Sequence, residues 1–264
     1  MKITKIGAKG LHLIKDFEGI IFLAGGLWRH ATPLWEGMRE ISGDCSARIL
    51  DLALSGPAQE GPLVFAAGID ALLQRALQPS ILLDVAKFFP MPMAILIEDA
   101  LKNWVSATLP ILAEEDFETG ARLAREVNRV ITNLESQQRI PTRVDGKFLI
   151  KQRRALDDFC RTTYREIVTI HITKALIELQ DGEPEAFEEI ETMARIARSL
   201  EDTGRRFGAP QSYLAVQEEF RAAIDQILYR KDNPFLTGQQ IARLAEILIG
   251  RETAERLLHR FRRR

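Results

Sequence analysis

Cysteine and histidine are scarce in this sequence of 264 residues. Its two cysteines, Cys45 and Cys160, lie more than a hundred residues apart, with no CxxC pair or metal-binding Cys/His spacing around either. The four histidines form no HxxxH or HExxH pair. These absences argue against a disulfide framework and the short zinc motifs, and they favour a reducing environment. We therefore expect a cytoplasmic protein with no metal and no other cofactor.

Valine is also rare, with 8 residues beside 32 leucines and 29 alanines. Leucine and alanine are strong helix formers, whereas valine is typical of strands. The hydrophobic fraction of 46% is large enough for a packed core, and the net charge of -1 excludes the highly charged disordered class. The composition therefore predicts a globular, predominantly helical chain.

Long apolar runs are missing, because no stretch approaches the roughly 18 uninterrupted apolar residues of a membrane span. Three charged residues interrupt the apolar stretch 11–27, so an amphipathic helix explains it better than a secretory signal does. Pro90 and Pro92 break the most apolar stretch, 81–97. The sequence therefore predicts no transmembrane segment.

Helical periodicity recurs along the whole chain, and Pro, Gly and Asp residues punctuate it. A helix is expected to start near 42–44 and to end at Ser55, Gly56 and Pro57. Later helices are expected at about 62–78, 79–89, 92–109, 114–138, 148–180, 184–207, 211–230, 237–249 and 251–261. No run alternates like a strand, and no motif recurs at a period of 30–45 residues. The predicted fold is all-α, an irregular multi-helix bundle or short helical superhelix of about ten helices with no regular repeat.

Charge is distributed unevenly along the chain. Residues 1–113 hold 21 of the 73 charged residues. Bases dominate 139–165, acids occupy 178–191 without a base, and six arginines lie in 251–264. We expect a single all-α unit over 1–264, with a possible subdivision into an apolar-rich half, 1–138, and a charged half, 148–264, joined by a loop at 139–147.

The helix expected at 148–180 carries the strongest candidates for acid–base chemistry. At 100° per residue its apolar residues form two arcs, Leu156, Cys160, Thr163, Ile167, Ile170 and Ile177 on one, and Val168, Ile172, Ala175 and Leu179 on the other. Tyr164, His171 and Glu178 lie between the arcs at heptad spacing, with Lys174 close by. We therefore expect His171 to be largely enclosed, either as an acid–base group or as a structural histidine in a buried polar network.

Two further sets of residues are candidates for binding. The first set consists of aromatic and methionine side chains. They could anchor a partner or a lipid-like ligand, or simply pack at helix junctions. They are Trp28, Trp35, Phe88, Phe89, Met91 and Met93. The second set consists of basic residues, which could contact nucleic acid or only cap helices. They are Arg139, Arg143, Lys147, Lys151, Arg153, Arg154, Arg260, Arg262, Arg263 and Arg264.

Short catalytic motifs are absent, since the sequence has neither a GxSxG elbow nor a GxxxxGK[ST] loop. The sequence therefore favours a non-catalytic helical protein that acts through protein–protein interaction or self-association as a homo-oligomer. One alternative is a binder of, or enzyme for, an apolar small molecule in a cavity between helices. The second alternative is nucleic-acid binding through the basic segment 139–154 or the arginine-rich C-terminus.

Overall fold

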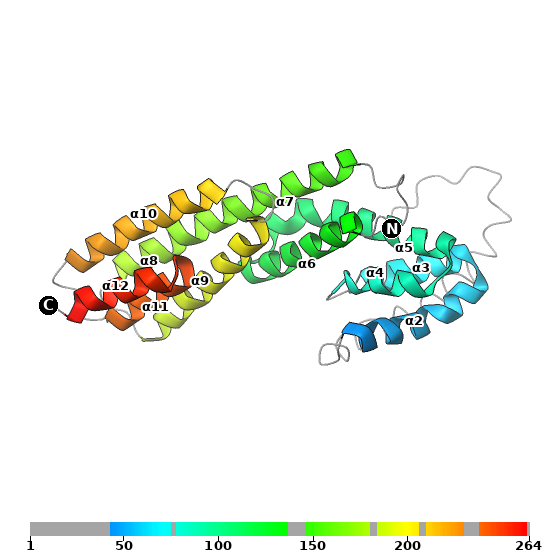
Figure 1. The fold of residues 1–264 in the computed structure, drawn as a ribbon, viewed down its shortest axis with the longest axis horizontal. Coiled ribbons are helices and arrows are strands. Elements are labelled where there is room, and N and C mark those ends of the chain that lie inside the picture. The colour runs from blue at the N-terminus through cyan, green and yellow to red at the C-terminus, as the bar shows by residue number, and fades with distance from the viewer. Residues whose placement is uncertain are drawn as a thin grey trace. The chain divides into compact units, whose positions relative to one another are not determined.

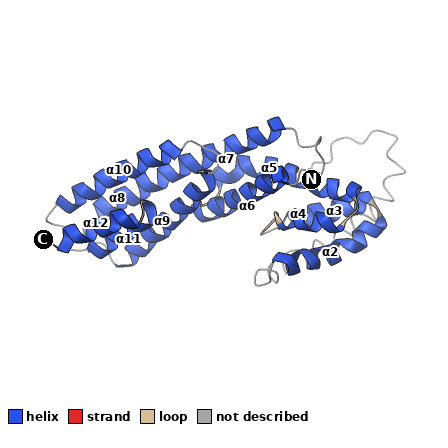
Figure 2. Ribbon diagram, in the orientation of Figure 1, coloured by secondary structure: helices blue, strands red, loops and turns tan. Residues whose placement is uncertain are grey.

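The computed structural model describes residues 43–74, 78–136, 146–179, 184–205, 210–229 and 238–262 (Figure 1). Throughout these ranges the regular elements are helices, and no strand is present (Figure 2). The prediction of an all-α fold is therefore confirmed. The α-helices are α2 (Gly43–Glu60), α3 (Pro62–Leu73), α4 (Ile81–Val85), α5 (Met91–Thr108), α6 (Phe117–Ser136), α7 (Gly146–Glu166), α8 (Thr173–Glu178), α9 (Pro184–Gly204), α10 (Pro210–Tyr229), α11 (Gly238–Leu248) and α12 (Arg251–Arg262).

The chain divides into two compact units. Of the described residues, the first unit holds those within 43–107 and 129–136, and the second holds 108–128 and those within 146–262. This division differs from the expected one at 139–147, because the first part of α6 belongs to the second unit. No helix of the described residues is both long enough and apolar enough to cross a membrane.

In the first unit, α2 packs against α3 and α4. Its core is made of large aliphatic and aromatic side chains such as Leu50, Leu54, Phe65, Leu72 and Leu82. The expected end of α2 at residues 55–57 is wrong, because the helix continues through Pro57 to Glu60. Proline has a helical φ and lacks one N–H, so a single proline in the last turns removes one hydrogen bond without ending the helix.

In the second unit, α7, α9 and α10 are the long helices, and α11 and α12 form a hairpin that packs against α9 through α11 (Figure 1). Gly250 joins α11 to α12 with a φ of 114°, a left-handed conformation that favours glycine. Its N–H donates to the carbonyl of Ala245 at 3.0 Å, which closes the end of α11. The predicted break at Gly250 is confirmed.

A π-helical segment, Ile167–Ile172, joins α7 to α8 without a break. Its i→i+5 pattern continues at Thr173, whose N–H donates to the carbonyl of Val168 and whose hydroxyl donates to the same oxygen at 2.7 Å. A π turn holds more residues than an α turn, so the side chains that follow are rotated relative to α-helical spacing.

This rotation changes which apolar residues are buried. Before it the buried positions follow the first expected arc to Ile167. From Val168 on they are Val168, Ile172, Leu176 and Leu179, of which Val168, Ile172 and Leu179 belong to the second expected arc. Ile170 and Ile177, which were expected on the first apolar arc, are 54% and 39% exposed. That part of the prediction is wrong because it assumed 100° per residue throughout.

Candidate functional site

A buried carboxylate lies where α7, α9 and α10 pack together. Glu201 on α9 is fully buried, and its Oε1 accepts a hydrogen bond from Nε2 of Gln217 at 2.9 Å. Arg198 and Arg205 approach its two carboxylate oxygens at 3.1 and 2.6 Å. Nε2 of Gln217 also lies 3.4 Å from the hydroxyl of Tyr164, to which it donates. Burial raises the pKa of Glu201 above its ordinary value, although both arginines oppose the shift.

Two tyrosines and a cysteine extend this cluster. The rings of Tyr164 and Tyr213 meet edge to face, with centroids 5.1 Å apart. The hydroxyl of Tyr213 is buried and has no hydrogen-bond partner within the described residues. It points at Gly204, where a Cβ would lie 2.0 Å from it and 3.1 Å from the Cβ of Cys160.

The chemistry of the cluster is that of a closed core. Cys160 and Tyr164 are fully buried, and burial raises the pKa of each to about 12. A buried thiol of this kind is protonated at neutral pH, and no substrate can reach it. The cluster therefore fixes the packing of three helices and does not form a reaction site.

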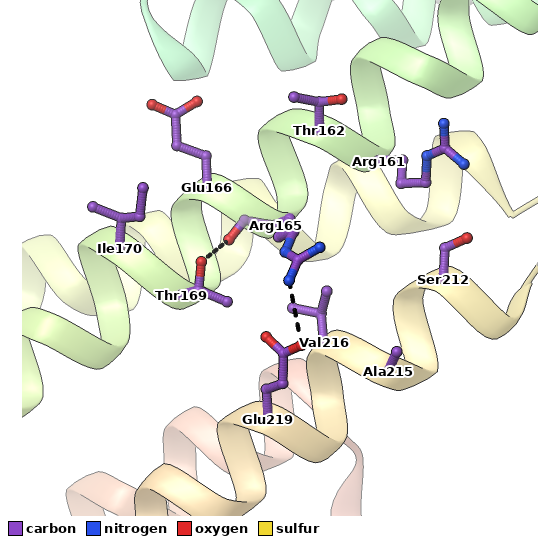
Figure 3. A pocket seen from close by; sticks show the side chains of 10 residues that line it. All are labelled: Arg161, Thr162, Arg165, Glu166, Thr169, Ile170, Ser212, Ala215, Val216 and Glu219. Carbon is purple, nitrogen blue, oxygen red and sulfur yellow. Dashed lines mark hydrogen bonds and ion pairs between the residues drawn. The ribbon is translucent and has the colours of Figure 1, made fainter.

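An open groove of about 640 Å³ lies between α10 on one side and α7 with the π-helical segment on the other (Figure 3). Below it is called the α7–α10 groove. Its lining residues are Arg161, Thr162, Arg165, Glu166, Thr169, Ile170, Ser212, Ala215, Val216 and Glu219. The lining has two basic, two acidic and three hydroxyl-bearing side chains, and its apolar residues are Ile170, Ala215 and Val216.

Figure 3 shows how the charges are arranged along this groove. Arg161 and Ser212 lie toward one end, whereas Glu166 and Ile170 lie toward the other. Between them, Nη2 of Arg165 lies 3.4 Å from Oε1 of Glu219, which links α7 to α10. The groove is therefore basic at one end and acidic at the other.

The described acid–base candidates lie in different surroundings. The prediction that His171 is enclosed is wrong, because its side chain is 42% exposed. Its ring stands edge to face with Phe117 of α6 at 5.0 Å, and its Nε2 lies 4.0 Å from Glu166. The π-helical segment accounts for the error, since it turns His171 outward while Tyr164, which precedes the segment, stays in the core. Lys174 is exposed, and the side chain of Glu178 lies outside the described residues.

The aromatic and methionine candidates that are described lie in the first unit. Phe88 is 40% exposed and lies under the guanidinium of Arg48, which is 4.1 Å from the ring centroid. Phe89 packs against Phe65 at 4.9 Å. Met91 is 54% exposed and Met93 is half-buried. Trp28 and Trp35 lie outside the described residues.

The basic candidates do not form one described patch. Lys147, Lys151 and Arg154 are exposed along α7, and Arg153 is half-buried. Arg260 on α12 is held by Asp225 of α10 at 2.9 Å. Outside the described residues lie Arg139, Arg143, Arg263, Arg264 and the side chain of Arg262.

Sequence reasoning did not identify Glu201 or the lining of the α7–α10 groove. A signal for Glu201 was present, because it continues a stripe of small apolar residues with Ala194 and Ala197 at helical spacing. A charge on such a stripe is expected to need buried partners. The groove had no comparable signal, since Arg165 and Glu219 are 54 residues apart in sequence.

No family model matches the chain, and neither a curated protein nor a solved structure matches it. In the part of the chain that the structure describes, no three His, Cys, Asp or Glu side chains are placed to share a metal ion. Function is therefore inferred from the geometry of the sites themselves.

Proposed function

We propose that this chain is a non-catalytic interaction protein that pairs with a second copy of itself through the α7–α10 groove. The observation that carries the proposal is Ile170, an isoleucine that the π-helical segment turns into this groove at 54% exposure. Burial of a whole isoleucine side chain is worth about 1.5–3 kcal/mol, so its exposure in a groove favours a partner that covers it. Departures from regular α-helix of this kind are frequent at functional sites.

The charges of the groove support a second copy as the partner. In a two-fold contact each copy presents the same surface, and opposite ends of that surface meet. Arg161 at the basic end of one copy would then face Glu219 and Glu166 of the other. An identical molecule therefore offers acidic side chains opposite Arg161.

Sedimentation velocity of the purified chain over a wide range of concentrations tests the proposal. The sedimentation coefficient should rise with concentration, and Ile170→Asp should weaken association at least tenfold, which corresponds to about 1.4 kcal/mol. Arg154→Glu is the matched control, because Arg154 is exposed on α7 but does not line the groove. A wild-type chain that stays monomeric at every concentration overturns the proposal.

Charge reversal tests the two-fold arrangement. Arg161→Glu and Glu219→Arg should each fail to self-associate, because like charges then face each other across the contact. An equimolar mixture of the two variants should associate, since one copy contributes only acids and the other only bases at these positions. Failure of the mixture while the wild type associates would show that the copies do not meet in this way.

We also propose that the protein acts in the cytoplasm. The free, buried thiol of Cys160 supports this location, because a reducing compartment keeps such a thiol intact.

A further inference from the structure

The first unit exposes large apolar side chains that its own core leaves uncovered. Leu52 on α2 is 74% exposed, and Leu63, Phe88 and Met91 are exposed as well. Single exposed apolar residues are normal on a protein surface, whereas a group of them on one small unit is typical of an interaction surface. The first unit therefore has apolar surface available for a partner.

One side of α2 carries part of this surface. Arg48, Leu52 and Gly56 follow one another at four-residue spacing, so they lie along the same side of the helix, and all three are exposed. The guanidinium of Arg48 lies over the ring of Phe88, 4.1 Å from its centroid, which places Phe88 beside this side of α2. Below, these four residues are called the Leu52 surface.

Gly56 favours a partner that packs closely over this surface. A Cβ at Gly56 would meet no described atom within 4 Å, so the described structure does not itself require a glycine there. Glycine is unfavourable within a helix, but it is suited to a place where another backbone approaches closely. Because Gly56 lies one turn beyond Leu52, that approach would cover the exposed leucine.

Arg48 gives the Leu52 surface a positive charge that is only weakly matched. Its side chain is 67% exposed, and its Nη1 lies 4.0 Å from Oδ2 of Asp51, which is too long for a hydrogen bond. A carboxylate on an approaching helix could bond to this guanidinium while its contact with the ring of Phe88 stays in place. The surface therefore fits an apolar helix with an acid at the edge of its apolar stripe.

Residues 11–27 of the same chain have this pattern. They lie outside the described residues, and their sequence predicts an amphipathic helix. At 100° per residue, Asp16 flanks the apolar stripe of that helix. The stripe consists of Leu13, Phe17, Ile20, Ala24 and Leu27. Such a helix is stabilised mainly by packing its stripe against another apolar surface.

The chain between this segment and α2 is long enough to bring the two together. Residues 28–42 separate the segment from Gly43, where α2 begins, and these 15 residues can span about 50 Å when extended. Leu52 is nine residues into α2, a rise of about 14 Å. A segment tethered in this way has an effective concentration on the order of millimolar at the surface. A second copy of the chain therefore competes poorly with it.

We propose that residues 11–27 pack as a helix on the Leu52 surface of their own chain. The apolar stripe covers Leu52 and Phe88, and Gly56 allows the two helices to approach closely. Asp16 pairs with Arg48 at the edge of the contact. The proposal is separate from self-association, because the Leu52 surface belongs to the first unit and the α7–α10 groove to the second.

Hydrogen exchange of the full chain, followed by mass spectrometry, tests this packing. Backbone amides within 11–27 should exchange at least tenfold more slowly than those of an unstructured peptide of the same sequence. Leu52→Asp should raise their exchange rate at least tenfold, because it places a charge under the apolar stripe. Phe17→Asp, which changes the other partner, should do the same. Leu214→Asp is the matched control, since Leu214 is an exposed leucine of α10 in the second unit.

Photo-cross-linking identifies what covers the surface. A benzophenone-bearing amino acid in place of Leu52 should form bonds to residues 11–27 in a product with the mass of one chain, at every protein concentration. Bonds only to other segments, or only to a second copy, would overturn the proposal. Fast exchange of 11–27 in the wild type would also overturn it. So would slow exchange that both Leu52→Asp and Phe17→Asp leave unchanged while circular dichroism shows folded chains.

Discussion

Replacing Gly204 with alanine should destabilise the second unit, although alanine is the better helix former. The new Cβ would lie 2.0 Å from the hydroxyl oxygen of Tyr213 and 3.1 Å from its Cζ. The ring of Tyr213 is only 1% exposed, so it cannot swing into solvent to relieve the contact. Overpacking of this kind costs about 1–3 kcal/mol, and such a short contact belongs at the upper end of that range.

Helix propensity partly offsets this cost. Alanine gains about 1 kcal/mol over glycine within a helix, which leaves a net loss of up to about 2 kcal/mol for Gly204→Ala. For a chain of this size a loss of about 2 kcal/mol lowers Tm by about 4–8 °C. Thermal unfolding followed by circular dichroism measures the shift.

A second substitution tests whether the hydroxyl of Tyr213 is responsible. Tyr213→Phe removes the clashing atom, and because that hydroxyl has no partner in the described structure, the single variant should be neutral or stabilising by up to about 1 kcal/mol. In the double variant the nearest ring atom to the new Cβ is Cζ at 3.1 Å, so most of the loss should be recovered. A Gly204→Ala variant as stable as the wild type, or a double variant no better than the single, would refute this account of the packing.

Three other outcomes follow from the same unit. The pKa of Glu201 in the folded chain is raised above its ordinary value of 4.5, so the free energy of unfolding should fall as pH rises from 4.5 through the folded pKa. The Glu201→Gln variant should not show this fall in urea titrations. The same pH dependence in the variant and the wild type would contradict the prediction. Cys160 should resist iodoacetamide in the folded chain and react once urea unfolds it, as mass spectrometry can follow; rapid labelling without urea would contradict its burial. The pKa of Asp116 is lowered in the folded chain, so the stabilisation that Asp116 provides should be lost as pH falls below 3.8. Asp116→Ala should lower Tm at pH 7 more than Asp116→Asn, because asparagine keeps an oxygen that can cap the helix. Equal losses of Tm in the two variants would argue against the cap.

Apolar periodicity was sufficient to predict most of the fold. It located α6, α9, α10, α11 and α12 to within a few residues, because each has a stripe at helical spacing, and Gly208, Asn233 and Gly250 follow α9, α10 and α11. The first apolar arc of α7 was wrong after Ile167, because a π turn changes the angle between successive side chains and no residue type marks where that change occurs. The errors at Ile170, His171 and Ile177 all follow from that one feature.

The two cavities were harder to predict because their residues come from distant segments. Glu115 and Asp158 line a second cavity of about 420 Å³, and Arg165 lies 3.4 Å from Glu219 across the α7–α10 groove, but no local pattern links either pair. Which faces meet is decided by helix packing, and sequence spacing within one helix does not encode it.

One turn of α7 takes part in both cavities. Thr162 and Glu166 line both the α7–α10 groove and a second cavity of about 420 Å³ on another side of α7. A substitution at Thr162 or Glu166 therefore alters two separate surfaces at once, whereas one at Arg165 or Glu219 alters the groove alone.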